Sequence, residues 1–466
     1  MTIIPDPEKS NLSPKLILFV VASVQFLTPF MMSAMGVALP AIGREFRAGA
    51  VHLGLIEMVY ILAVTLLLLP AGRYADIHGR KKIFIAGALV MTVATLLLAM
   101  STGIRFFIVL RFFQGVGAAM ITSTSVAIIT SVMPHERLGQ AMGIIVACVY
   151  VGLSAGPTLA GVMITNLGWR WIFYAAVPVE LAALLLTIAK LKGEWADAQG
   201  QRFDWVGSLI YMAALFGLIF GVINLKEMVI APWIAAAGAA GLILFISYES
   251  KSDSPLLDVR LLASNRVFTF SNIATWINYA ACFGLVFFFS LYLQSVKGLS
   301  AQATGLILVI QPIVQALFSP ISGRLADRYP PAQIATIGMA ICTIALMMAV
   351  FLTPDTPMFM IYMILALIGL GFGLFSSPNT TAIMSSVVSE HYGIAASLMA
   401  TMRGAGMLTS MTIITAILTV FMGDQPLAPD TIDGFIASMH TAFICFSIMC
   451  AAGIGFSFVR FNPNAS

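Results

Sequence analysis

Long apolar runs follow one another along the whole chain, and they constrain its fold more than any other feature. A window of about 20 residues, the length that crosses a bilayer as a helix, finds fourteen such runs. They lie near residues 16–42, 51–71, 83–101, 104–131, 140–164, 171–189, 205–224, 229–248, 268–295, 300–321, 334–353, 356–385, 393–422 and 434–459. Only 9% of the 466 residues are charged, against roughly 25% in an ordinary soluble domain. The sequence therefore predicts an all-α polytopic membrane protein and excludes a soluble globular fold.

The basic residues indicate how the chain crosses the membrane. If the N-terminus is cytoplasmic, most of the 24 Lys and Arg residues fall in loops on the cytoplasmic side, as the positive-inside rule requires. An even number of spans then returns the C-terminus to the same side. We therefore expect an inner-membrane protein with both termini in the cytoplasm. The net charge of +4 is too small and too scattered to indicate nucleic-acid binding.

Two halves of the sequence repeat each other. Gly72-Arg-Tyr-Ala-Asp76 recurs 251 residues later as Gly323-Arg-Leu-Ala-Asp327, and Gly115-Val-Gly117 recurs 254 residues later as Gly369-Leu-Gly371. Matches in register at nearly constant spacing predict two related six-helix bundles. Six helices need only about 200 residues, so this spacing leaves room for two further helices. We expect an N-terminal six-helix bundle over 1–203, two additional linker transmembrane helices over 204–249, and a C-terminal six-helix bundle over 250–466.

The repeated loop has the chemistry of a conformational latch. Its first copy contributes Gly72, Asp76, Gly79 and Arg80, and its second copy contributes Gly323 and Asp327. Glycines allow a tight hinge between helices, and an aspartate suits the positive N-terminus of a helix in the opposite bundle, with Arg80 as a charged partner. Because the second copy lacks the basic tail, we expect it to lock more weakly. The alternative is a basic loop that merely obeys the positive-inside rule.

Several motifs, in the correct order, resemble those of the major facilitator superfamily. They are the loop from Gly72 to Lys82, Arg111-Phe-Phe-Gln114-Gly115-Val-Gly117 on the fourth helix, Gly152-Leu-Ser-Ala-Gly156-Pro157-Thr-Leu-Ala-Gly161 on the fifth helix, and Trp169-Arg-Trp-Ile-Phe173. With fourteen spans, the chain is similar to the fourteen-helix drug:proton antiporter family, of the multidrug efflux type. This resemblance implies the major facilitator fold, and the fifth-helix motif implies antiport rather than uptake.

The fifth-helix motif also has a physical interpretation. Gly152, Gly156 and Gly161 permit close helix contact, and Pro157 removes a backbone hydrogen bond and bends the helix. These properties suit a moving seam between the two bundles. Ordinary packing of small residues is the alternative.

Two arginines lie inside predicted spans. Arg111 is deep in the fourth span, and Gln114 follows three residues later on the same helical face. A charge at this depth is costly unless it faces protein or water, which makes Arg111 a functional candidate, or else a structural residue satisfied by carbonyls. Arg403, beside Gly404 and Gly406 in the thirteenth span, is a second candidate unless it sits at a helix end.

Proton coupling is where the sequence departs from the family pattern. Family members usually carry an aspartate on the first helix, shortly before the Ala38-Leu-Pro40 seen here, and that position is Met31. Two carboxylates with no evident partner remain in spans, Glu57 on the second helix and Glu180 on the sixth. A carboxylate in an intermittently wetted apolar site exchanges protons as access alternates. We favour Glu57 as the proton carrier over Glu180, because the second helix borders the gap between bundles in this fold. The alternatives are that Glu57 lies near the wet outer surface and that Glu180 bonds to a neighbouring helix.

Motifs for other activities are missing. No Gly-Lys-Ser/Thr loop is present to cradle the phosphates of ATP, and the five histidines form no HExxH pair. The five cysteines show no metal-binding spacing. We therefore expect no cofactor, no metal and no enzymatic activity.

The residues expected at the substrate cavity come from both bundles. They are Met31 and Met35 on the first helix, Asn272 and Trp276 on the ninth, Gln311 and Gln315 on the tenth, and Arg403. Methionine and aromatic surfaces accommodate varied apolar ligands, and the chain has 27 Met and 32 Phe. The predicted function is a proton-driven secondary transporter that exports lipophilic compounds or drugs by alternating access. Two alternatives remain: a dedicated transporter of one metabolite, including an anionic one held by Arg111, and a non-transporting membrane receptor or enzyme on the same fold.

Overall fold

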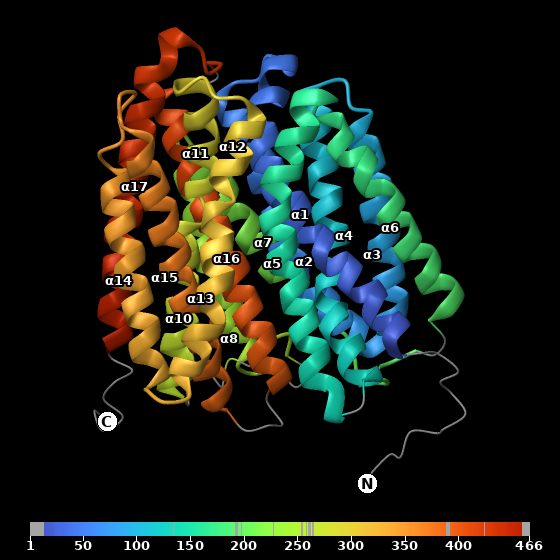
Figure 1. The fold of residues 1–466 in the computed structure, drawn as a ribbon. Coiled ribbons are helices and arrows are strands. Elements are labelled where there is room, and N and C mark those ends of the chain that lie inside the picture. The colour runs from blue at the N-terminus through green and yellow to red at the C-terminus, as the bar shows by residue number, and fades with distance from the viewer. Residues whose placement is uncertain are drawn as a thin grey trace.

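The computed structural model describes residues 14–458 except 134, 192–193, 197, 227, 253–254, 258, 260–261, 263–264, 388–391 and 424. Both ends of the chain lie outside the described residues. Within the described part, the elements are helices and no strand is formed. Fourteen of these helical segments are long and apolar enough to cross a membrane, which confirms the predicted spans (Figure 1).

The spans fall into three groups along the chain. The first six are α1 (Pro14–Phe46), α2 (Ala50–His78), α3 (Arg80–Ala99), α4 (Ile104–Val132), α5 (His135–Asn166) and α6 (Arg170–Lys190). The next two are α7 (Trp205–Ile223) and α8 (Ala231–Glu249). The last six are α10 (Arg266–Cys282) continued by α11 (Leu285–Leu291) and the π-helical turn η2 (Tyr292–Val296), α12 (Ala301–Leu308) continued by α13 (Ile310–Ala326), α14 (Pro331–Ala349), α15 (Met358–Ser385), α16 (Tyr392–Phe421), and α17 (Ile432–Phe458), which follows the short turn η4 (Pro429–Thr431).

The first and last groups form two six-helix bundles that stand side by side (Figure 1). Because the number of spans is even, α1 begins and α17 ends at the same end of the molecule. We call this end the terminal side and the opposite end the distal side. The bundle α1–α6 is the N-bundle, and the bundle α10–α17 is the C-bundle.

Equivalent glycine contacts show that the two bundles are built alike. In the N-bundle, a side-chain carbon on Gly117 of α4 would lie 2.7 Å from the carbonyl oxygen of Gly87 on α3. In the C-bundle, a side-chain carbon on Gly371 of α15 would lie 2.8 Å from the carbonyl oxygen of Gly338 on α14. Both pairs bring two backbones into direct contact, as small residues do between membrane helices. The repeat predicted from the sequence is therefore a repeat of packing.

Two spans of the C-bundle are interrupted for local reasons. The ninth span turns at Gly284, whose backbone N–H donates to Ser410 Oγ of α16 at 3.0 Å. The tenth span breaks at Val309 because Pro312 has no amide proton to give to the carbonyl of Leu308, four residues before it. The segments that follow the first break and precede the second, α11 and α12, contact α1 and α5 of the N-bundle.

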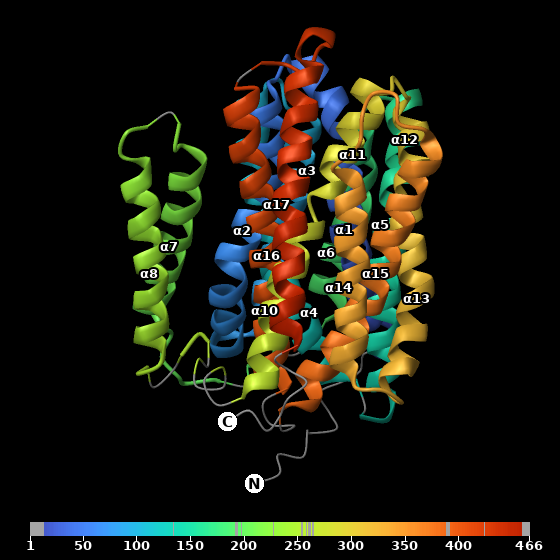
Figure 2. The same cartoon turned by 90° about the vertical axis from the view of Figure 1, so that its left-hand side faces the viewer.

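The hairpin α7–α8 flanks the bundles on one side (Figure 2). Tyr211 on α7 donates its hydroxyl hydrogen to the carbonyl of Thr65 on α2 at 2.9 Å. Near the distal side, Lys226 Nζ donates to the carbonyl of Val420 on α16 at 3.1 Å. The outer face of the hairpin is apolar and open, with Trp233 77% exposed. The hairpin therefore covers the edge where α2 and α16 meet and presents its other face to lipid.

Candidate functional site

The α5–α12 seam joins the two bundles on the distal side. A side-chain carbon on Gly161 of α5 would lie 2.6 Å from the carbonyl oxygen of Ala301 on α12, and Gly305 of α12 packs against the carbonyl of Pro157. Only a residue without a side chain fits at these two glycine positions. Pro157 and Gly161 therefore lie at a contact between bundles.

The other two glycines of the same motif have a different place. Gly152 packs against the carbonyl of Phe26 on α1, and a side-chain carbon on Gly156 would lie 2.8 Å from the carbonyl oxygen of Phe30. These contacts are inside the N-bundle, because α5 crosses α1 along its middle and meets α12 only further toward the distal side. The expectation of a single inter-bundle seam for the whole motif is wrong for this half of it.

Two more contacts close the distal half. Ser290 Oγ of α11 donates to the carbonyl of Gly36 on α1 at 2.6 Å, and Gln294 Nε2 donates to the carbonyl of Val37 at 3.0 Å. Near the start of α2, a side-chain carbon on Gly54 would lie 2.8 Å from Thr415 Oγ1 of α16. The two bundles are thus held together on the distal side.

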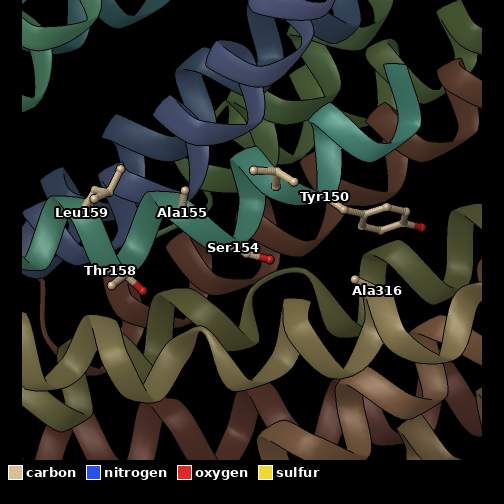
Figure 3. A pocket seen from close by; sticks show the side chains of 7 residues that line it. Tyr150, Ser154, Ala155, Thr158, Leu159 and Ala316 are labelled. Carbon is tan, nitrogen blue, oxygen red and sulfur yellow. The ribbon is translucent and has the colours of Figure 1, made fainter. Parts of the chain in front are cut away.

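An open pocket of about 400 Å³ lies next to this closed seam, between α5 and α13 (Figure 3). Two of its lining residues, Val151 and Leu159, are 57% and 45% exposed, so the pocket is open at the surface of the molecule. Its lining consists of Tyr150, Val151, Ser154, Ala155, Thr158, Leu159 and Ala316. The side chains of Ser154 and Thr158 point from α5 toward the facing helices. The lining is mostly apolar with three hydroxyl groups. Ser154, Ala155, Thr158 and Leu159 belong to the fifth-helix motif, for which the sequence predicted a seam and not a pocket.

Arg111 lies at the centre of a buried polar chain in the N-bundle. Its guanidinium pairs with Glu57 Oε2 at 3.5 Å and donates through Nη1 to Gln114 Oε1 at 2.6 Å. Its Nε donates to the carbonyl of Ile56 at 3.3 Å, and its guanidinium carbon lies 4.3 Å from the centre of the Tyr60 ring. Arg111 is fully buried. It is therefore satisfied within the bundle, and the expectation that it holds an anionic substrate is wrong in this conformation.

The buried polar chain continues from Gln114 through Thr95 to Glu180. Gln114 Nε2 donates to Thr95 Oγ1 at 3.0 Å, and Thr95 Oγ1 donates to Glu180 Oε1 at 3.2 Å. Glu180 Oε2 is buried with no hydrogen-bond partner among the described atoms. The two carboxylates that showed no evident partner in the sequence thus terminate one chain, Glu57 through its ion pair with Arg111 and Glu180 through Thr95. Thr95 is a member that sequence reasoning missed.

Gly115 explains how α2 and α4 come close enough for this chain to form. A side-chain carbon there would lie 2.5 Å from the carbonyl oxygen of Tyr60. The glycine that follows Gln114 in the fourth-helix motif therefore sets the spacing between Arg111 and Glu57.

The cavity residues expected from α1 are elsewhere. Met31 and Met35 are 1% and 0% exposed and belong to the hydrophobic core. Neither side chain therefore lines a pocket in this conformation, because α1 turns both methionines into the packed core.

The cavity residues expected from the C-bundle are also mostly buried or half-buried. Asn272 and Gln315 are buried, and Asn272 Nδ2 donates to the carbonyl of Phe268 at 2.9 Å. Gln311 is half-buried. Trp276 is 36% exposed, and its Nε1 donates to Thr409 Oγ1 at 3.2 Å.

Arg403 borders a second, small space within the C-bundle. This space measures about 10 Å³ and is lined by Thr275, Tyr279, Phe375, Ser376, Asn379, Thr380, Met399 and Arg403. The guanidinium carbon of Arg403 lies 5.4 Å from the centre of the Tyr279 ring, and its buried Nε has no hydrogen-bond partner among the described atoms. Because Arg403 lies well inside α16, the alternative that it sits at a helix end is wrong.

The latch loop lies on the terminal side, between α2 and α3. Asp76 Oδ1 accepts a hydrogen bond from Arg80 Nε at 2.8 Å and pairs with Arg80 Nη2 at 2.7 Å. Gly79 has a φ of +118°, which only glycine adopts at little cost. In this conformation Asp76 therefore pairs within its own loop, instead of with a helix end of the C-bundle as the latch expectation requires.

The segment between α6 and α7 holds this loop in place. The backbone N–H of Lys81 donates to Glu194 Oε1 at 2.8 Å, and the N–H of Ala198 donates to the carbonyl of Asp76 at 3.0 Å. Sequence reasoning did not find this contact. In the second copy of the loop, a side-chain carbon on Gly323 would lie 3.1 Å from Ser377 Oγ, and Asp327 is exposed.

Comparison with known proteins identifies the class. The family model described as Major Facilitator Superfamily matches residues 21–411, so this chain belongs to that superfamily. Its members are transporters rather than enzymes. The chain is therefore a multi-pass membrane protein and a transporter.

Its relatives differ in what their names say they carry. The riboflavin transporter RibZ of Clostridioides difficile (strain 630) is 28% identical over 447 residues, covering 94% of this chain and 96% of that protein. The multidrug resistance protein Stp of Mycobacterium tuberculosis (strain CDC 1551 / Oshkosh) is 28% identical, covering 83% of this chain and 72% of that protein. A solved bacterial homologue of the human lysosomal transporter Spinster superposes with a TM-score of 0.68 at 15% identity, covering 96% of this chain and 97% of the other. That structure supports the fold alone.

Proposed function

We propose that this protein is a proton-driven secondary transporter that exports lipophilic compounds by alternating access. The observation that carries this proposal is the open pocket of about 400 Å³ beside a closed distal seam. Its mostly apolar lining suits a lipophilic substrate, and its hydroxyl groups orient polar atoms. The Gly161 and Gly305 contacts close the distal half in this conformation, and an opposite conformation would separate them.

The polar chain of the N-bundle is the proposed proton site. Glu57 and Glu180 are the ionisable acids that exchange protons, and Glu57 takes the main role because it contacts Arg111 directly. Protonation of Glu57 would remove its attraction for Arg111 and so loosen the packing between α2 and α4. A change of protonation that favours one conformation over the other is what couples a proton to transport.

The terminal side is proposed to be cytoplasmic, in an inner membrane. The latch loop then faces the cytoplasm, and the open latch seen here, with Asp76 bound to Arg80, belongs to the conformation that is closed on the distal side. In the opposite conformation Asp76 would leave Arg80 for the C-bundle. The proposed units of movement are residues 1–203 and 250–466, with the two linker helices of 204–249 between them in sequence.

Transport into everted vesicles tests this function. We expect vesicles that contain the wild-type protein to accumulate a fluorescent lipophilic dye when respiration acidifies their interior, and a protonophore to abolish the accumulation. Vesicles containing the Glu57→Gln variant at equal abundance are the control. Accumulation that persists with the protonophore would contradict proton coupling, and a correctly inserted wild type that moves no dye would contradict the multidrug function.

One observation favours a second candidate, a transporter dedicated to one metabolite. RibZ, named as a riboflavin transporter, is matched over nearly its full length and that of this chain. Competition separates the two candidates. A multidrug exporter is inhibited by many unrelated lipophilic compounds, whereas a dedicated transporter is inhibited only by close analogues of its substrate.

A further inference from the structure

Arg403 is a charged group in the membrane interior without a counter-ion among the described residues. Gly404, its neighbour on α16, faces the middle of α2, where a side-chain carbon on Gly404 would lie 3.1 Å from Thr65 Oγ1. Arg403 therefore lies near mid-depth in the bundle. A lone arginine at that depth costs several kcal/mol unless it faces water, protein or a ligand. Its buried Nε is without a hydrogen-bond partner in the described part of the chain.

The described part of the surrounding bundle offers no acid to balance this charge. Within α10–α17, the acidic residues that the structure describes are Asp327, Asp355, Asp430 and Asp433. All four lie at or beyond the end of a helix. The acids of the N-bundle have other partners: Glu57 pairs with Arg111, Glu180 accepts from Thr95, and Glu45 pairs with Arg170 at 2.7 Å.

Polar and aromatic groups around Arg403 complete a recognition site. Asn379 Nδ2 donates to the carbonyl of Ser271 at 3.0 Å and to Thr275 Oγ1 at 2.9 Å, which holds the amide in place. Tyr279, Phe375 and Met399 supply aromatic and polarizable surface for an apolar ligand. A guanidinium beside such surface suits a ligand that joins an anionic group to an aromatic body.

Tyr279 lies between the small space beside Arg403 and Tyr150 of the larger pocket. At about 10 Å³ the small space holds little more than one water molecule in this conformation. Tyr279 forms a side-chain hydrogen bond with Arg403 and lies near Tyr150, which lines the pocket of about 400 Å³. The proposed ligand path from the larger pocket to Arg403 therefore runs past Tyr279.

We propose that Arg403 binds the anionic group of the substrate, so that the preferred substrates are amphiphilic organic anions with an aromatic body. This inference rests on the proposed transport function and specifies its substrate class. It also assigns different tasks to the bundles, with proton exchange in the N-bundle and recognition of the anion in the C-bundle.

Two dyes on one skeleton test the inference. Fluorescein is an anion and rhodamine 123 a cation at neutral pH, and both have the same three-ring core. We expect the purified wild type in detergent to bind fluorescein more tightly than rhodamine 123, as measured by fluorescence anisotropy. The Arg403→Gln variant is expected to lose fluorescein affinity by about tenfold or more and to keep or gain affinity for rhodamine 123. Arg403→Lys keeps the charge and is expected to fall between.

Arg105→Gln is the matched control, because Arg105 is exposed at the distal start of α4. Elution of each variant as a single peak in size-exclusion chromatography ensures that folded protein is compared. Equal fluorescein affinity in Arg403→Gln and wild type, or wild-type preference for rhodamine 123, would overturn the inference. Because binding is measured without a proton gradient, Arg403-dependent binding with no proton-driven transport would instead refute the proposed function and leave the inference standing.

Discussion

The two bundles repeat each other in packing and differ in how they treat charge. In the N-bundle, Arg111 is paired with Glu57 and Asp76 is paired with Arg80. In the described part of the C-bundle, Arg403 has an unsatisfied Nε, and Asp327 is exposed. The positions that correspond to Glu57 and Arg111 in the C-bundle, at the repeat offsets, are Leu308 and Leu365. The shared packing preserves the fold, while the charges differ: the buried arginine of the N-bundle has an acidic partner, and the buried arginine of the C-bundle has none among the described residues.

The largest expected effect is on stability. Arg111→Leu leaves Glu57 as a buried charge without its partner, which costs about 3–5 kcal/mol. Arg403→Leu removes a charge that has no counter-ion among the described residues, so its free energy of unfolding is expected to stay unchanged or rise. Thermal denaturation followed by size-exclusion chromatography at pH 7.5 measures both. Equal losses of stability in Arg111→Leu and Arg403→Leu would contradict the claim that only the arginine of the N-bundle has an acidic partner.

The second effect concerns coupling. Glu57→Gln keeps the shape of the side chain and removes its proton exchange, so proton-driven transport is expected to fall by about tenfold or more. Glu180→Gln is expected to reduce it less, because Glu180 reaches Arg111 only through Thr95 and Gln114. Dye accumulation in everted vesicles compares the two. A larger loss of proton-driven transport in Glu180→Gln than in Glu57→Gln would make Glu180 the main proton carrier instead of Glu57.

The third effect compares the two latch loops. If Asp76 stabilises one conformation, Asp76→Asn lowers the transport rate by about fivefold. Asp327→Asn is expected to lower it by less than about twofold, because the second loop lacks the basic tail. Initial rates in vesicles of equal protein content measure both. Equal loss in both variants would show that the two loops lock equally.

The smallest expected effect is the difference in stability between removing one buried hydroxyl from the N-bundle and removing one from the C-bundle. Thr95→Val removes a bond to Glu180 and another from Gln114 at once, and is expected to cost about 1–3 kcal/mol of stability. Thr275→Val in the C-bundle leaves Asn379 bonded to the carbonyl of Ser271, so we expect about 1 kcal/mol or less. Chemical denaturation in detergent measures the free energy of unfolding of both variants. A larger loss of stability in Thr275→Val than in Thr95→Val would contradict this prediction.

Much of the architecture was predictable from the sequence. Apolar run length gives the fourteen spans, because the bilayer sets the length of a helix. The repeat of Gly117 in Gly371 predicts the repeated α3–α4 and α14–α15 contacts. The spacing of Arg111 and Gln114 predicts that they share one helical face, and the 2.6 Å hydrogen bond between them confirms it.

The partners between helices were not predictable in the same way. The pairing of Glu57 with Arg111 depends on the relative rotation and height of α2 and α4, which periodicity within one helix does not contain. Thr95 gave no signal, because a threonine in an apolar helix commonly satisfies itself on a carbonyl of the preceding turn. The places of Met31 and Met35 were not predictable either, because the sequence does not give the rotation of α1, which packs both side chains into the core.

The central claim is that protons and substrate move in opposite directions, and proton flux tests it most directly. Proteoliposomes with a pH-sensitive dye inside are loaded with substrate and diluted into substrate-free buffer, without any imposed proton gradient. The account predicts that substrate efflux acidifies the lumen in the wild type and that Glu57→Gln abolishes this acidification. Substrate efflux with no change in internal pH, in wild-type protein that is correctly inserted, would contradict it.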